Sequence, residues 1–190
     1  NYWGLGLPHP NLKNAYDPGD PRLRTTMAWE GSNDSIEVAG SVRFPISFSH
    51  SVTKTYQRKW ENSAVEYIDH SADWTHAPSN VKLIRYSDVY LIAAEAALLT
   101  GDNAKALAYV NKVRERARMC GTSGQPAALT SVSLSDIIHE RRLEFAGEGH
   151  RMFDIVRWNI AAGLLTGTTY DGTPIEFVKG KNEFQPIPQR

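Results

Sequence analysis

The chain has 190 residues, and its 21 lysines and arginines balance its 21 aspartates and glutamates. This length suffices for one domain with a substantial core. The neutral balance argues against a nucleic-acid partner and against a polybasic membrane patch. The single cysteine, Cys120, excludes an intramolecular disulfide, and no apolar run approaches the roughly 20 residues of a membrane-spanning helix.

Residues 1–82 are rich in glycine, proline, serine and asparagine, and residues typical of turns recur along them. This composition predicts loops with one or two short strands, for example over residues 41–48. A long irregular segment in a compact domain usually carries function or leans on other structure. We therefore predict a single domain with a loop-rich segment over 1–82, a candidate source of ligand-binding loops, and a helical region over 83–190.

Residues 83–118 have the pattern of a helical hairpin. The apolar stripe of the first helix consists of Ile84, Leu91, Leu98 and Leu99. The apolar stripe of the second helix, over 103–118, consists of Ala106, Leu107, Val110, Val113 and Ala117. Gly101 lies between the two stripes, where glycine typically ends a helix. Many alanines in both helices would allow a close approach, as in tetratricopeptide-like pairs.

Charged residues lie on both of these apolar stripes. Asp88 and Glu95 fall on the first stripe, and Arg114 falls on the second. A buried charge without a partner is very costly. We therefore predict that Asp88 or Glu95 pairs with an arginine, with Arg114 as the first choice.

A third helix is predicted over 134–148, with Ser133 as its N-cap and Asp136 in a capping-box position. At about 100° per residue, one apolar face of this helix consists of Leu134, Ile138 and Phe145. A fourth helix is predicted over 150–162. The tail is rich in glycine and threonine, and we expect a short hairpin around Asp171.

The third and fourth helices carry more charges than a core normally accepts. Arg141 lies in the middle of the apolar face, and Glu144 and Glu148 lie at its edge. Arg151 and Asp154 share one face of the fourth helix at a spacing of three residues. We predict a structural ion-pair network without a chemical role. Its predicted members are Asp88, Glu95, Arg114, Glu140, Arg141, Glu144, Glu148, Arg151 and Asp154.

Several stretches of the chain carry a resemblance to a known family. ERRLEFAGEGHRMFDIVRW at 140–158 closely resembles the C-terminal signature of the SusD/RagB family of outer-membrane nutrient-binding lipoproteins. Two further motifs of that family precede it in the same order, RYSDVYLIAAE at 85–95 and NKVRERA at 111–117, and its closing segment is similar to FQPIPQ at 184–189. Weaker echoes are DPR at 20–22 and RKW at 58–60. The similarity is specific over 83–158 and loose over 1–82.

The resemblance implies a mainly α-helical fold, a SusD-like α–α superhelix of tetratricopeptide-like hairpins with a loop-rich face. It also implies that these residues are the C-terminal portion of a longer lipoprotein on the surface of a Bacteroidetes-type outer membrane, held by a lipid anchor in the N-terminal part. Such a protein captures glycans or related nutrients without a cofactor and passes them to a SusC-type TonB-dependent transporter. The expected function is therefore binding, not catalysis.

Two other functions fit parts of the sequence. The helical hairpin also fits a tetratricopeptide-like scaffold that binds peptides or proteins, although no repeat recurs. Glu140 with Glu144 or Glu148 could flank a cleft as in a glycoside hydrolase. However, neighbouring arginines lower the pKa of carboxylates and so oppose a general-acid role. No metal site is predicted, because the HExxH motif that His139 would begin has Leu143 in place of its second histidine.

The tryptophans of the loop-rich segment are the candidate ligand contacts. Sugars present C–H faces that stack on aromatic rings, and loops often carry binding residues. Trp29 and Trp74 rank first because polar residues lie close by in the sequence, and Trp3 ranks third. Near Trp29 those polar residues are Asn33 and Asp34. The alternative is that each tryptophan anchors a loop on the core.

Overall fold

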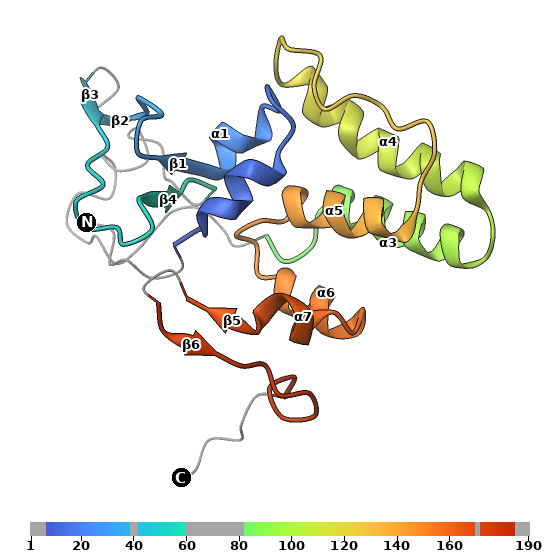
Figure 1. Ribbon diagram of the computed structural model, residues 1–190. Coiled ribbons are helices and arrows are strands. Elements are labelled where there is room, and N and C mark those ends of the chain that lie inside the picture. The colour runs from blue at the N-terminus through green and yellow to red at the C-terminus, as the bar shows by residue number, and fades with distance from the viewer. Residues whose placement is uncertain (1–6, 39–41, 60–81, 170–171, 185–190) are drawn as a thin grey trace. The chain divides into compact units, whose positions relative to one another are not determined.

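The computed structural model describes residues 7–38, 42–59, 82–169 and 172–184 (Figure 1). The chain forms two compact units, Asn1–Glu148 and Gly149–Arg190. The first unit extends well beyond residue 82, where the sequence analysis places the end of the loop-rich segment. Within the described residues, no helix is both long enough and apolar enough to cross a membrane.

Short elements make up the start of the first unit. They are the 3-10 helix η1 (Pro10–Ala15), α1 (Arg22–Thr26), β1 (Met27–Trp29), β2 (Ser35–Val38), β3 (Val42–Pro45) and β4 (Thr55–Gln57). β1 pairs antiparallel with β4, so that Trp29 lies opposite Thr55, and β2 pairs antiparallel with β3. Two small two-stranded sheets therefore replace the one or two strands predicted from the sequence. Turn-forming residues between the strands keep each of them short.

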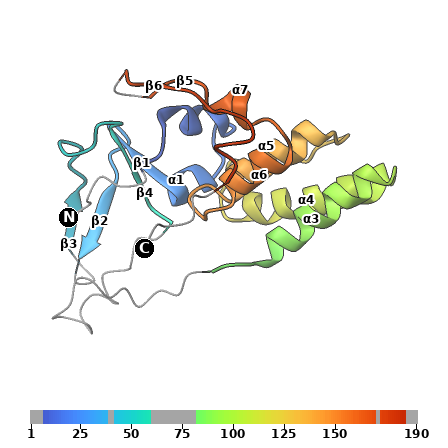
Figure 2. The same ribbon diagram turned by 90° about the horizontal axis from the view of Figure 1, so that it is seen from below.

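Three helices form the larger part of the first unit. They are α3 (Tyr86–Leu99), α4 (Asn103–Met119) and α5 (Leu134–Glu144). Figure 2 shows α3 and α4 side by side, as the hairpin pattern predicted. Their core consists of Leu91, Ala94, Val110, Val113, Ile137 and Phe145. Gly101 has a φ of +85° directly after α3, which explains the glycine at this turn.

The predicted stripe on the first helix of the hairpin is only partly correct. Leu91 is fully buried, but Ile84 precedes α3 and is 73% exposed, and Leu99 is 71% exposed. Asp88 and Glu95, which lie on the predicted stripe, are buried as expected. The stripe therefore faces the core over Asp88, Leu91 and Glu95, but not at Ile84 and Leu99.

The buried face of α5 is not the predicted one, because the helix is rotated about its axis relative to the prediction. Leu134 is 37% exposed and Ile138 is half-buried. The helix ends at Glu144, and Phe145 is buried just beyond that end. The buried side chains within α5 are Ile137, Glu140, Arg141, Leu143 and Glu144. Its polar residues therefore face inward, where arginines of other elements meet them. The capping box of Ser133 and Asp136 is confirmed.

The second unit has a small core of its own. Its elements are α6 (Arg151–Arg157), α7 (Ala161–Leu165), β5 (Gly167–Thr168) and β6 (Pro174–Ile175). Ile155, Ala161 and Phe177 form the core. The single helix predicted over 150–162 is in fact two helices, because Asn159 adopts a φ of +56° and breaks the helical path. β5 and β6 pair antiparallel on either side of the position where the hairpin was predicted.

Candidate functional site

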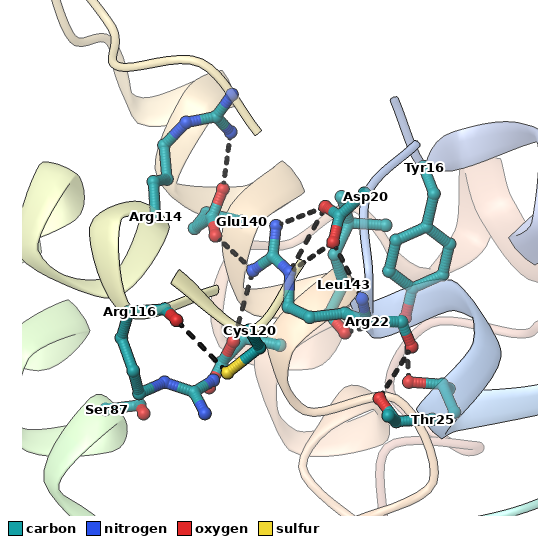
Figure 3. Close-up of polar contacts among 12 residues, drawn as sticks. Tyr16, Asp20, Arg22, Thr25, Ser87, Arg114, Arg116, Cys120, Glu140 and Leu143 are labelled. Carbon is teal, nitrogen blue, oxygen red and sulfur yellow. Dashed lines mark hydrogen bonds and ion pairs between the residues drawn. The ribbon is translucent and has the colours of Figure 1, made fainter. Parts of the chain in front are cut away.

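Arg22 lies at the centre of a buried ion-pair network in the first unit (Figure 3). Its Nη1 donates to Glu140 Oε1 at 2.5 Å and to Glu144 Oε2 at 3.1 Å. Its Nη2 donates to Asp20 Oδ2 at 2.7 Å. Glu140 and Glu144 are four residues apart on α5, so both point toward α1. Only 8% of the Arg22 side chain is exposed, and these three carboxylates compensate its charge.

Arg114 joins the same network from α4, but with partners other than the predicted ones. It donates to Glu140 Oε2 at 2.7 Å and to Asp17 Oδ2 at 3.3 Å. Asp88 pairs instead with Arg141, whose Nη1 lies 2.7 Å from Asp88 Oδ1. Asp88 therefore pairs with an arginine, as predicted, but that arginine is Arg141 and not Arg114. Successive residues of α5 point to different neighbours, Glu140 toward α4 and Arg141 toward α3.

Glu144 is the most heavily paired carboxylate among the residues described. Besides Arg22 it accepts from Arg85 Nη1 at 2.5 Å and from Arg116 Nη2 at 2.7 Å. Burial opposes its charged form, but the charges of the arginines outweigh burial and lower the pKa of Glu144 to about 2. Glu148 accepts from Lys59 Nζ at 2.5 Å and from Arg85 Nε at 2.8 Å. The pKa of Glu148 is also lowered, because Arg85 and Lys59 outweigh its burial.

These carboxylates line an open pocket of about 700 Å³. A glycoside hydrolase would need one of its two carboxyl groups protonated near neutral pH, as the general acid. The lowered pKa values of Glu144 and Glu148 oppose that state. Among the described residues, no group of three or more histidine, cysteine, aspartate or glutamate side chains could hold a metal ion. The charged side chains that line the pocket are therefore paired with one another.

Tyr16 connects η1 to the end of α5. Its hydroxyl donates to the carbonyl of Leu143 at 2.8 Å and contacts Thr26 Oγ1 at 3.2 Å. Burial raises the pKa of Tyr16 to about 12. We expect Tyr16→Phe to lower the free energy of unfolding by about 1–3 kcal/mol, since a buried carbonyl loses its donor. Urea denaturation measures this, with the exposed Tyr86→Phe as control. Equal midpoints for the two variants would contradict the prediction.

The predicted charges of the second unit lie on α6. Asp154 is buried, and its Oδ1 accepts from Arg157 Nε at 2.9 Å. Arg157 also covers the ring of Trp158, with its guanidinium carbon 4.1 Å from the ring centroid. Asp154 thus pairs with an arginine three residues later on the same helix.

Trp29 is the one candidate ligand tryptophan within the described residues, because Trp3 and Trp74 lie outside them. It is half-buried at the end of β1, and Lys13 Nζ lies 4.8 Å from its ring centroid. The next residue, Glu30, is one of those that line an open hollow of about 510 Å³. The described residues that line the hollow are Glu30, Gly31, Asn33, Asp34, Ser35, Pro45, Ile46 and Phe48.

Phe48 was missed as a candidate by sequence reasoning. Its ring stacks on Tyr56 with centroids 5.4 Å apart, and it forms part of the wall of the hollow. An aromatic residue within the serine-rich stretch 47–51 was the available signal. The predicted ligand contacts were all tryptophans, whereas a phenylalanine lines the hollow.

Comparison with known proteins places the chain in one family. The SusD family model matches residues 10–189. SusD-like protein P25 of Formosa agariphila is 34% identical over 123 residues, which are 64% of this chain and 23% of that protein. SusD-like protein P2 of the same organism is 26% identical over 98% of this chain and 37% of its own length.

Solved structures agree with this assignment. A laminarin-binding SusD-like protein is 30% identical, with a TM-score of 0.65 over 94% of this chain and 34% of that chain. A SusD-like protein of Bacteroides fragilis has a TM-score of 0.61 at 24% identity over 82% of this chain and 36% of that chain, and it supports the fold alone. The chain thus spans less than two-fifths of the length of these relatives. It belongs to the SusD family.

Proposed function

We propose that the protein binds a glycan at the surface of a Bacteroidetes-type outer membrane, without changing it chemically, and delivers it to a SusC-type TonB-dependent transporter. The observation that carries this proposal is the 30% identity to a laminarin-binding SusD-like protein over 94% of this chain. The organisms of the curated relatives, Formosa agariphila and Bacteroides ovatus, fit such a location. Delivery and membrane attachment are functions proposed for the whole protein.

The chemistry of the described residues supports binding over catalysis. Glu140 and Glu144 are almost fully buried and are held by arginines on several sides. A carboxylate whose pKa lies near 2 donates no proton at neutral pH, so Glu144 does not suit the role of an acid catalyst. The open hollow that begins one residue after Trp29 combines the aromatic ring of Phe48 with hydrogen-bonding side chains, the kinds of group that sugar binding uses.

Affinity electrophoresis in a laminarin gel tests the proposal. We expect the chain to be retarded and to release no reducing sugar. Trp29→Ala should reduce retention, because a stacked aromatic at a binding site typically contributes more than about 1 kcal/mol. Tyr86→Ala is the matched control, since Tyr86 is an exposed aromatic on α3.

The possible results separate the binding proposal from the role of Trp29. Circular dichroism must show the native spectrum for each variant. A folded chain that migrates freely through laminarin and a panel of other glycans would refute glycan binding by these residues. Retention that Trp29→Ala leaves intact would assign the contact to another residue. Release of reducing sugar would favour the hydrolase.

A further inference from the structure

The outward face of α3 is apolar along the whole length of the helix. Six residues form this face, and they are Tyr86, Val89, Ile92, Ala93, Ala96 and Leu99. At about 100° per residue all six fall within one arc of the helix. The four large ones among them are 50–74% exposed. A surface helix normally turns polar residues outward, so this arc is not an ordinary solvent-facing surface.

The charged residues of α3 lie on the opposite side of the helix. Asp88 and Glu95 are both buried, and within α3, which the structure describes in full, no charged side chain faces outward. The neighbouring α4 has the usual arrangement, because Lys105, Lys112 and Glu115 are exposed along it. A helix that is apolar on its outer side as well as toward the core is usually covered on both sides.

The lack of charge on this face permits contact with an identical face. A two-fold axis brings the same patch of both copies together, so that any charge near the axis meets its own copy. Like charges that meet across an interface cost several kcal/mol. The outward face of α3 carries no such cost, and its apolar side chains gain from leaving water.

The order of large and small residues fits an antiparallel pair of α3 helices. A two-fold axis that passes between Ile92 and Ala93 places Ile92 of one copy opposite Ala93 of the other. The same axis places Val89 opposite Ala96. Large side chains near the axis therefore face alanines, which lets the two helices approach closely. At the two ends of the contact Tyr86 lies opposite Leu99.

The exposed area of this face is sufficient for a concentration-dependent contact. With roughly 200 Å² for a fully exposed large apolar residue, the four large residues expose on the order of 500 Å² per chain. A pair then buries about 1,000 Å² in total, near the lower limit of a specific interface. Leu83 and Ile84 are also exposed directly before α3 and extend the apolar area. Tyr86 is supported by the ring of Tyr90, with centroids 5.4 Å apart in edge-to-face geometry.

We propose that the protein associates with a second copy of itself through the outward face of α3, as an antiparallel two-fold pair. The contact leaves the inward side of α3 unchanged, including the ion pair of Asp88 with Arg141. The inference is independent of the proposed glycan binding, because it rests on the surface of α3 alone.

Sedimentation equilibrium of the 190-residue chain at low to high micromolar concentrations tests the pairing. The wild type should pass from monomer to dimer as its concentration rises. Ile92→Lys should raise the dissociation constant of the dimer by about a hundredfold or more, because it places two lysines beside the axis. Ile92 is 54% exposed, so the lysine can reach solvent in a folded monomer. Ala108→Lys adds the same charge to the exposed side of α4 and is the matched control, which should dimerise like the wild type.

Cysteine cross-linking tests the antiparallel register and keeps the proposal testable if Ile92→Lys does not fold. Cys120→Ser first removes the single native thiol. In that background Ile92→Cys should cross-link with a short bis-maleimide, because each copy of this position lies beside the axis. Leu99→Cys should not, since its two copies lie roughly 20 Å apart along the paired helices. Equal cross-linking at both positions would overturn the antiparallel arrangement.

Two further outcomes would refute the pairing. A wild type that stays monomeric at every concentration overturns it, and the face then fits an apolar helix of a longer polypeptide. A dimer whose dissociation constant Ile92→Lys leaves unchanged, while circular dichroism shows a native fold, forms through another surface and overturns it as well.

Discussion

Replacing Glu144 by glutamine is expected to lower the free energy of unfolding by about 3–5 kcal/mol. The carboxylate is 1% exposed and accepts from Arg22, Arg85 and Arg116. Glutamine has nearly the same volume but no charge, so these guanidinium groups would lose their shared counter-charge. The Arg22 side chain is only 8% exposed, so water cannot readily replace the carboxylate there. Urea denaturation at neutral pH measures the loss.

The matched control for Glu144→Gln is the same exchange at an exposed position. Glu115 pairs with Lys112 at 3.3 Å on the same helix, and its side chain is 49% exposed. Such surface pairs contribute little, so Glu115→Gln should change stability by less than about 0.5 kcal/mol. Glycan affinity of the folded fraction should be the same in both variants. Equal urea midpoints would show that the network does not stabilise the fold.

Local patterns in the sequence were sufficient to predict α3, α4 and the start of α5. The hairpin of α3 and α4 followed from apolar spacing and Gly101, and the start of α5 followed from the capping box at Ser133. The rotation of α5 did not follow, because the apolar spacing of Leu134 and Ile138 indicated another face. Glu140 and Glu144 are buried on α5 instead, where arginines of other elements pair with them.

The partners in the network could not be predicted because they lie far apart in the chain. Arg22 and Glu140 are separated by 118 residues, and Lys59 and Glu148 by 89. No spacing rule connects such positions. The sequence did mark three of the network residues, since the segments that weakly resemble the family at 20–22 and 58–60 contain Asp20, Arg22 and Lys59. Their charges gave no indication of which carboxylates they would meet.

Only part of the lining of the hollow could be predicted from the sequence. Asn33 and Asp34 could be named as hydroxyl partners because they follow a loop tryptophan. The pairing of Asp34 with Arg24 and Arg58 could not be predicted, since no spacing rule connects these positions. Phe48 enters the hollow through the pairing of β2 with β3, which brings residues 30–35 and 45–48 together.

Acid should destabilise the protein between about pH 4.5 and pH 2, through Glu144 above all. In the folded chain the pKa of this carboxyl is about 2, against an ordinary value of 4.5. As the pH falls, the unfolded chain therefore takes up the proton first. The stabilisation by Glu144 is complete above pH 4.5 and is lost as the pH falls through 2. The difference between the two pKa values corresponds to about 3 kcal/mol.

Glu144→Gln identifies the share of this acid sensitivity that belongs to Glu144. Glutamine does not titrate, so the variant lacks the decrease that Glu144 causes in the wild type. Free energies of unfolding from urea titrations at pH 7, 5, 4, 3 and 2 should therefore differ most at neutral pH and converge toward pH 2. Other carboxylates, including Glu148 with its lowered pKa, still titrate in both proteins. Parallel curves would mean that Glu144 has the same pKa in the folded and the unfolded chain, so that its arginine partners only offset the cost of burying its charge.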